Sequence, residues 1–325
     1  MGLFERVFKP SDAAGSVEAD PIIDRLVGAT DRRLTYVKGY RATLRGPVLA
    51  ARERLRQAVA LIPGPAEVSA AAWSRDDTVR SLFAKTADVP LAFGNDPGTR
   101  AWFDAHAGCD CIGMLALEKR ERRVLTSALQ GDTVQAEVVR TTVSFTEPQI
   151  LAPGGDEAAV RAQLVQRALE YLALRALQRV GAMRAEKHEL EKERALLQAQ
   201  LRLAESKGAG FAGLAGGAPR AEIEKELERT VSELEAAASR QLLPGLLGAM
   251  IDALAKSEAY LTIEPGAIAI DSMNFAVDAA SPQAIVPKVA ILKLVNRGPF
   301  AVLIARFPRA ELRTDNRLAE AEKFL

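Results

Sequence analysis

The spacing of apolar residues divides the chain into helical and extended stretches. Over residues 34–62, apolar residues recur at three- and four-residue steps, which is typical of an amphipathic helix. Pro47, which follows Gly46, should kink or split this helix, and the Pro-Gly-Pro run at residues 63–65 should end it, because proline has no N–H to donate. Residues 69–87 continue the helical pattern.

The period changes from helical to two between residues 89 and 145, which predicts a sheet region. The charged stretch 118–123 and the Gln-Gly-Asp run at 130–132 resemble turns, so we expect a three-stranded antiparallel meander here. Two later stretches, 286–295 and 300–307, are apolar at nearly every position. Such runs are typical of central strands that are covered on both faces.

A long helix is predicted for the middle of the chain. Residues 158–207 contain no proline and a single glycine, and at 1.5 Å per residue they would form a helix of about 75 Å. Apolar residues recur along it at seven-residue intervals, an imperfect heptad: Leu169, Ala176, Met183, Leu190, Leu197 and Ala204. A Gly-rich connector at 208–217 precedes a second apolar stripe that starts at Ile223. These features predict an antiparallel helical hairpin.

Together, the patterns predict an α+β protein in which antiparallel β-sheet regions flank a long central, coiled-coil-like helical hairpin. We expect an N-terminal helical and antiparallel-sheet region over residues 1–150 and the hairpin over residues 156–256, with its connector at 208–217. A C-terminal antiparallel-sheet region should occupy residues 257–325, the last of which, from 310 onward, resemble a charged helix. The pattern leaves open whether the two sheet regions form one domain.

The charge balance is nearly neutral overall but uneven along the chain. The 43 basic and 42 acidic residues give a net charge of +1, which argues against a wholly basic nucleic-acid coat protein. Residues 31–56, however, hold eight Lys or Arg and two acids, a local charge of +6. Five of these cations fall near one helical face and could bind phosphates or an anionic lipid: Lys38, Arg41, Arg45, Arg52 and Arg56. The alternative is an ordinary solvated or acid-paired helix face, and aromatic residues are too sparse for an obvious base-stacking platform.

Few residues could carry catalysis. His106, Cys109 and Cys111 lie within six residues and could supply soft metal ligands or an activated thiol. Three ligands do not complete a tetrahedral site, and both cysteines share the strand parity of two leucines, so buried structural cysteines are the favoured interpretation. The chain lacks the phosphate-loop and serine-nucleophile signatures, and neither a catalytic residue nor a cofactor is predicted.

The sequence therefore favours a non-enzymatic scaffold or adaptor that acts through the hairpin, by self-association or by binding a protein partner. Two alternatives are a nucleic-acid or anionic-membrane binding module that uses the basic face of residues 32–56, and an enzyme that uses His106 with Cys109 or Cys111. Two cysteines and the lack of a recognisable secretory signal or transmembrane segment favour the cytoplasm.

Overall fold

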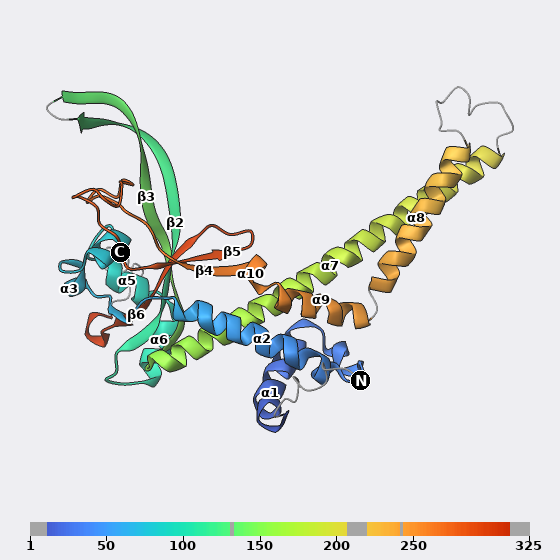
Figure 1. The fold of residues 1–325 in the computed structure, drawn as a ribbon, viewed down its shortest axis with the longest axis horizontal. Coiled ribbons are helices and arrows are strands. Elements are labelled where there is room, and N and C mark those ends of the chain that lie inside the picture. The colour runs from blue at the N-terminus through green and yellow to red at the C-terminus, as the bar shows by residue number, and fades with distance from the viewer. Residues whose placement is uncertain (1–11, 131–132, 207–219, 241–242, 313–325) are drawn as a thin grey trace, which may run out of the picture. The chain divides into compact units, whose positions relative to one another are not determined.

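The computed structural model describes residues 12–130, 133–206, 220–240 and 243–312 and has an α+β fold (Figure 1). The chain forms two compact units. Unit 1 comprises Met1–Ala51 and Leu169–Ser257, and unit 2 comprises Arg52–Ala168 and Glu258–Leu325. Each unit is therefore assembled from segments that are distant in the sequence.

Unit 2 contains one six-stranded sheet with the strand order β3-β2-β6-β5-β4, in which neighbours are antiparallel, and β1 pairs in parallel with β6. The strands are β1 (Ala66–Glu67), β2 (Cys111–Gln130), β3 (Thr133–Gly154), β4 (Leu261–Pro265), β5 (Ala290–Leu294) and β6 (Phe300–Phe307). Strands from both predicted sheet regions thus belong to a single sheet, which answers the question that the sequence left open.

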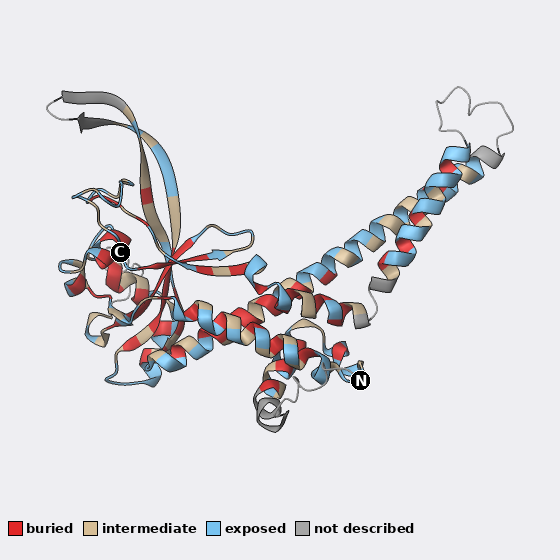
Figure 2. Ribbon diagram, in the orientation of Figure 1, coloured by how far each residue is buried: buried red, intermediate tan, exposed pale blue. Residues whose placement is uncertain are grey.

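The core of unit 2 lies against the central strands. In β6 every residue but Arg306 is buried, as the apolar pattern predicted, and Leu303 pairs in register with Leu115 of β2. Phe307 stacks on Phe93 with the ring centroids 4.2 Å apart. Figure 2 shows buried residues along the crossing strands. Four short helices add to this core or its rim: α3 (Ala70–Trp73), α4 (Asp77–Leu82), α5 (Asp88–Gly94) and α6 (Pro97–Ala105).

The predicted three-stranded meander is wrong. Its first part forms helices α5 and α6, and the charged stretch 118–123 lies inside β2 instead of forming a turn. Beyond Glu118, where its pairing with β6 ends, β2 continues with β3 as a two-stranded ribbon to the Gln130–Thr133 pair. Residues 121–123 are exposed on both sides of this ribbon. A solvated ribbon accepts charged side chains in mid-strand, which is why the charge run was not a turn signal.

Helix α2 (Tyr40–Ala60) follows α1 (Asp12–Thr30) and the short 3-10 helix η2 (Arg32–Tyr36). Its predicted apolar stripe is buried: Leu44, Val48, Ala51, Leu55 and Val59. The helix continues through Pro47 and is not split, because burial on both sides of the proline outweighs its cost of about 3 kcal/mol. It ends before Gly64, where a side chain would collide with the carbonyl oxygen of Ile304.

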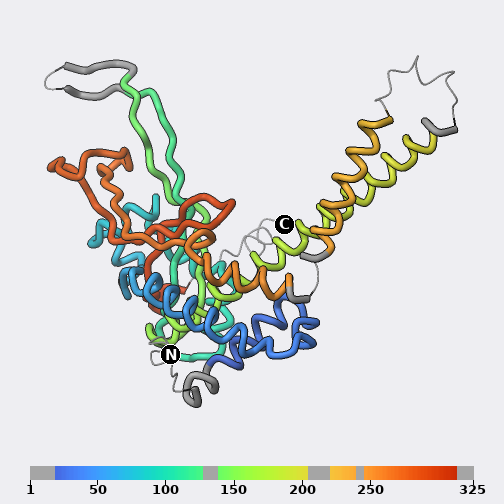
Figure 3. The backbone as a smooth tube through the Cα atoms, turned by 45° about the vertical axis from the view of Figure 1, so that its right-hand side comes forward, coloured from blue at the N-terminus to red at the C-terminus, as the bar shows by residue number. Residues whose placement is uncertain are grey.

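The predicted long helix is confirmed as α7 (Glu157–Ser206), with 50 residues. It is followed by α8 (Arg220–Arg240), α9 (Leu243–Ala255) and α10 (Ser257–Tyr260). In both Figure 1 and Figure 3, α8 lies beside the C-terminal part of α7. The connector predicted at 208–217 and most of the predicted C-terminal helix lie outside the described residues. None of the described helices has the length and apolar character needed to cross a membrane.

Candidate functional site

Part of the predicted basic face is paired with acids that the local charge count missed. Arg41 donates a hydrogen bond from Nη2 to Asp24 Oδ2 at 2.8 Å, and Arg45 Nη2 lies 3.3 Å from Asp20 Oδ1. Both acids belong to α1, which comes before the basic stretch in the sequence but packs beside it in unit 1. Lys38, just before α2, is exposed. The folded surface of this region is therefore less basic than the sequence suggests.

The other two residues of the predicted face, Arg52 and Arg56, belong to unit 2. Arg56 donates from Nη2 to Glu53 Oε1 at 2.8 Å, and the hydrogen bonds from Arg56 and Gln57 lower the pKa of Glu53 to about 2. A pocket of about 350 Å³ lies between the end of α2 and the start of α7, lined by Arg52, Arg56, Val59, Ala60, Ala158, Arg161, Ala162 and Val165. Five of its lining residues are valine or alanine, and the other three are arginines.

Arg161 holds the two helices of this pocket together. Its Nη1 and Nη2 donate to the carbonyl oxygens of Val59 and Ile62 at 2.7 and 2.9 Å, and its Nε donates to Glu157 at 2.7 Å. The arginine thus adds donors to carbonyl groups at and just beyond the C-terminal end of α2, where regular helical hydrogen bonding stops. Its guanidinium is committed to the fold and is not available for a ligand.

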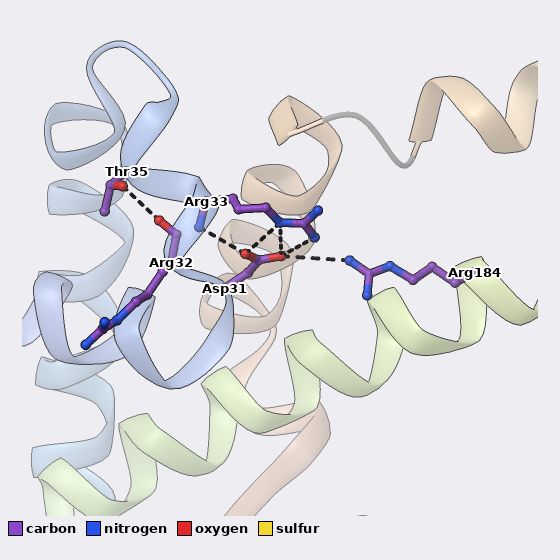
Figure 4. Close-up of polar contacts among 5 residues, drawn as sticks. All are labelled: Asp31, Arg32, Arg33, Thr35 and Arg184. Atoms are coloured by element: carbon purple, nitrogen blue, oxygen red, sulfur yellow. Dashed lines mark hydrogen bonds and ion pairs between the residues drawn. The ribbon is translucent and has the colours of Figure 1, made fainter.

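A second polar cluster surrounds Asp31 in unit 1 (Figure 4). Asp31 caps η2 by accepting from the backbone N–H of Arg33 at 3.0 Å, and it also accepts from Arg33 Nη2 at 2.7 Å. Arg184 of α7 lies 3.8 Å from the same carboxylate. The hydrogen bonds from Arg33 lower the pKa of Asp31 below its ordinary value. Asp31 therefore remains charged at neutral pH, neutralises Arg33 and ties η2 to α7.

A polar hollow of about 440 Å³ lies between α1, η2 and the start of α2. Its lining residues are Asp24, Val27, Gly28, Arg32, Arg33, Thr35, Tyr36, Tyr40 and Arg41. Figure 4 shows the Arg32 side chain turned away from the Asp31 cluster, and Tyr36 is 82% exposed. The sequence counted Arg32 in the basic stretch but did not place it among the five cations of the helical face, and it did not single out Tyr36. The structure puts both residues in η2, before α2 begins. The sequence RRLTY at residues 32–36, which sets two arginines close to a tyrosine, was the signal that could have identified these residues.

The predicted His–Cys cluster does not come together as one group. His106 is exposed and stacks on Trp102 at 4.7 Å, and its Nδ1 lies 2.9 Å from the Trp102 carbonyl oxygen. Cys109 is exposed and precedes β2, so the two cysteines do not share a strand face, whereas Cys111 is buried in the first position of β2. Burial raises the pKa of Cys111 to about 12, which keeps it as a thiol, a poor nucleophile and metal ligand. Within the described residues, no three His, Cys, Asp or Glu side chains are grouped so as to hold a metal ion.

Helices α7 and α8 supply a third candidate surface. Ile223, Thr230 and Leu234 of α8 are buried, and so is Leu197 of α7. Arg194 of α7 has a buried Nε with no hydrogen-bond partner among the described residues. On α7, Leu196 and Leu203 are 59% and 54% exposed and lie seven residues apart, so they share one helical face.

Comparison of the chain with protein-family models, with curated proteins and with solved structures found no match.

Proposed function

We propose that this protein is a non-enzymatic scaffold or adaptor, and that α7 and α8 form a coiled-coil-like hairpin through which it associates with a second copy of itself. The observation that carries the proposal is the pair of leucines exposed at heptad spacing on α7, a helix whose other side faces α8.

The spacing along α8 supports a coiled-coil-like contact with α7. Five of its buried or half-buried residues alternate at four- and three-residue steps: Ile223, Leu227, Thr230, Leu234 and Ala237. Val231 and Ala238 are half-buried beside this series. A matching series on α7 has the same steps, with two cations in it: Met183, Lys187, Leu190, Arg194, Leu197 and Leu201. This alternation is the a and d pattern of helices that pack side by side. The sequence between the two helices is Gly-rich and short enough for them to be consecutive antiparallel neighbours.

The proposed association surface consists of Leu196 and Leu203. Single exposed leucines are common on protein surfaces and carry no meaning alone. Two leucines on one face of a long helix, one heptad apart, have the spacing of a seam in a helix–helix contact. Fully burying a leucine stabilises a contact by about 1.5–3 kcal/mol. A symmetric dimer would bury Leu196 and Leu203 of both chains, and this burial would stabilise the association substantially.

The test is the molar mass of the full chain, measured by light scattering during size-exclusion chromatography over a range of concentrations. We expect a dimer, and we expect the double variant Leu196→Glu/Leu203→Glu to weaken its association about 100-fold or more, because charged residues replace the buried leucines. Leu61→Glu is the matched control, since Leu61 is 49% exposed in unit 2. Circular dichroism confirms that each variant keeps its helices. A wild-type monomer at every concentration, or a dimer that the double variant leaves unchanged, contradicts the proposal.

The two alternative functions have less support. Binding of nucleic acid or an anionic membrane by the face of Lys38, Arg41, Arg45, Arg52 and Arg56 is weakened by the acids that already pair with three of these residues. An enzyme that uses His106 with a cysteine thiolate is weakened by the burial of Cys111 and the exposed position of Cys109.

A further inference from the structure

We infer that the polar hollow beside η2 is a nucleotide-binding site, in which Arg32 binds a phosphate group and Tyr36 stacks on the base. The inference concerns unit 1 alone and does not depend on self-association through α7 and α8. It rests on three features: the Arg32 guanidinium, the exposed ring of Tyr36, and the hollow that both residues line.

The charges around the hollow leave Arg32 available. Asp31 engages Arg33, and Asp24 engages Arg41, so each carboxylate in this region has its own guanidinium. Arg32, by contrast, forms no side-chain hydrogen bond or ion pair among the described residues, and it points to the opposite side of η2 from the Asp31 cluster (Figure 4). An arginine in this position can offer two parallel N–H donors to phosphate oxygens.

The aromatic rings define the second part of the ligand. Tyr36 is 82% exposed at the C-terminal end of η2 and lines the same hollow as Arg32. The ring of Tyr40 is fixed, because its hydroxyl donates to Asp24 Oδ1 at 3.1 Å. Stacking of a base on an aromatic side chain contributes about 1–3 kcal/mol and tolerates any base. A free ring beside a free guanidinium matches a base that carries a phosphate better than it matches a simple anion.

The local backbone holds Arg32 and Tyr36 in place without a ligand. Leu34, between them, is 1% exposed and anchors η2 in unit 1. Asp31 caps the first turn, and the Thr35 hydroxyl donates to the Arg32 carbonyl oxygen at 2.8 Å. A site that is already ordered loses less conformational entropy when it binds. The volume of about 440 Å³ also falls within the usual range of 300–1,000 Å³ for small-molecule pockets.

Gly28 provides a way to fill the hollow without disturbing the fold. It lines the hollow from α1, and a Cβ placed on it would meet no atom within 4 Å. Leucine is a better helix former than glycine. Gly28→Leu should therefore keep or raise the stability of α1 while its side chain occupies the space of the ligand.

The experiment is isothermal titration calorimetry on the full chain with AMP, UMP, inorganic phosphate, adenosine and an eight-nucleotide single strand. We expect a nucleotide, free or within the strand, to bind more tightly than phosphate or adenosine. We expect Arg32→Gln and Tyr36→Ala each to weaken binding about tenfold. Gly28→Leu should abolish binding, and Arg25→Gln, an exposed arginine of α1 outside the hollow, should leave it unchanged.

Each result decides the inference. If the strand binds and AMP and UMP bind more weakly, with the same variants affected, the nucleotide is supplied by a nucleic acid. The inference is overturned if no nucleotide binds, if phosphate binds as tightly as AMP, or if Gly28→Leu and Arg32→Gln bind like the wild type. The variant Leu196→Glu/Leu203→Glu should still bind the nucleotide, which separates this test from that of self-association.

Discussion

The sheet of unit 2 and the α7–α8 pair of unit 1 bury their apolar residues to different extents. In β6, seven of the eight residues are buried, with β2 and β5 on either side. In α8, the buried residues among those described form a single stripe, and Thr230 is one of them. A strand covered on both faces has little surface left for a partner, whereas a helix that buries one stripe presents most of its circumference to solvent. Among the described residues, β6 is therefore part of a core that is covered on both sides, whereas α8 leaves most of its side chains exposed.

The largest expected effect is on the free energy of unfolding, when one buried side chain in each region is truncated to alanine. Phe307→Ala removes a fully buried ring that stacks on Phe93, and should lower the free energy of unfolding of unit 2 by about 3–5 kcal/mol. Leu234→Ala should cost about 2 kcal/mol and affect only the helices. The chain has two tryptophans, Trp73 and Trp102, and both pack against the core of unit 2.

Tryptophan fluorescence during urea unfolding therefore reports on unit 2, and far-ultraviolet circular dichroism reports mainly on the helices. We expect Phe307→Ala to move the fluorescence transition and Leu234→Ala to leave it in place. An equal shift of that transition by both variants would show that the two regions unfold as one and that the comparison is wrong.

A smaller effect should come from a buried carboxylate of unit 2. Asp271 accepts hydrogen bonds from the backbone N–H groups of Met273 and Phe275, and Arg140 donates to it at 2.7 Å. Burial alone would raise the pKa of Asp271, but these hydrogen bonds hold it below its ordinary value. A lowered pKa in the folded state stabilises the fold above the ordinary carboxyl pKa of about 3.9, and this stability is lost as the pH falls through the folded-state value.

Asp271→Asn should therefore lower the free energy of unfolding at pH 7 by about 1.5 kcal/mol and flatten its decline below pH 4, as measured by fluorescence-detected urea unfolding. Asp31→Asn is the matched control in unit 1, since the pKa of Asp31 is also lowered. It should leave the fluorescence transition unchanged. A steep acid decline that survives in Asp271→Asn would assign that pH dependence to other groups.

Helix α7 should become more stable when Arg194 is replaced. Arg194→Leu removes a buried Nε that has no partner among the described residues and makes one of the two cationic positions of the α7 series apolar. We expect a gain of about 1 kcal/mol in the thermal unfolding of the helices, followed by circular dichroism. Arg202→Leu, at an exposed position of the same helix, is the control and should give no comparable gain. A loss of stability in Arg194→Leu would indicate that the arginine has a partner in solution.

The smallest effect concerns the two cysteines. At pH 8, the exposed Cys109 should react with Ellman's reagent at once, and Cys111 should react only after unfolding, because burial raises its pKa to about 12. Cys109→Ser should remove the fast phase without changing the free energy of unfolding. Rapid reaction of both thiols in the folded protein would contradict the buried position of Cys111.

Residues near the candidate sites show where prediction from the sequence stops. The local charge of +6 over residues 31–56 was counted correctly, but the acids that pair with Arg41 and Arg45 belong to α1 and lie outside the counted stretch. The prediction that Cys109 and Cys111 share a strand face was wrong because β2 starts only at Cys111. Arg32 belongs to the same basic stretch, yet its significance depends on which neighbouring arginine the Asp31 carboxylate engages. The pairings of the arginines are contacts between side chains, and the periodicity of the sequence carries no information about such contacts.

The sequence by itself determined the features that depend on neighbouring residues: the length of α7, the end of α2 before residues 63–65, and the buried character of β6. The period of the apolar residues indicates which side of a helix or strand faces a core, so it can be recognised within a short stretch of sequence. Only the tertiary structure decided that strands from residues 111–154 and 261–307 share one sheet, that β2 runs through a charged stretch, and that Arg32 has no acidic partner in the described parts of the chain. The shared sheet depends on partners that lie far along the chain, and the state of Arg32 depends on which neighbouring arginine Asp31 engages. Both are set by the packing of the whole unit and not by the period of a short segment.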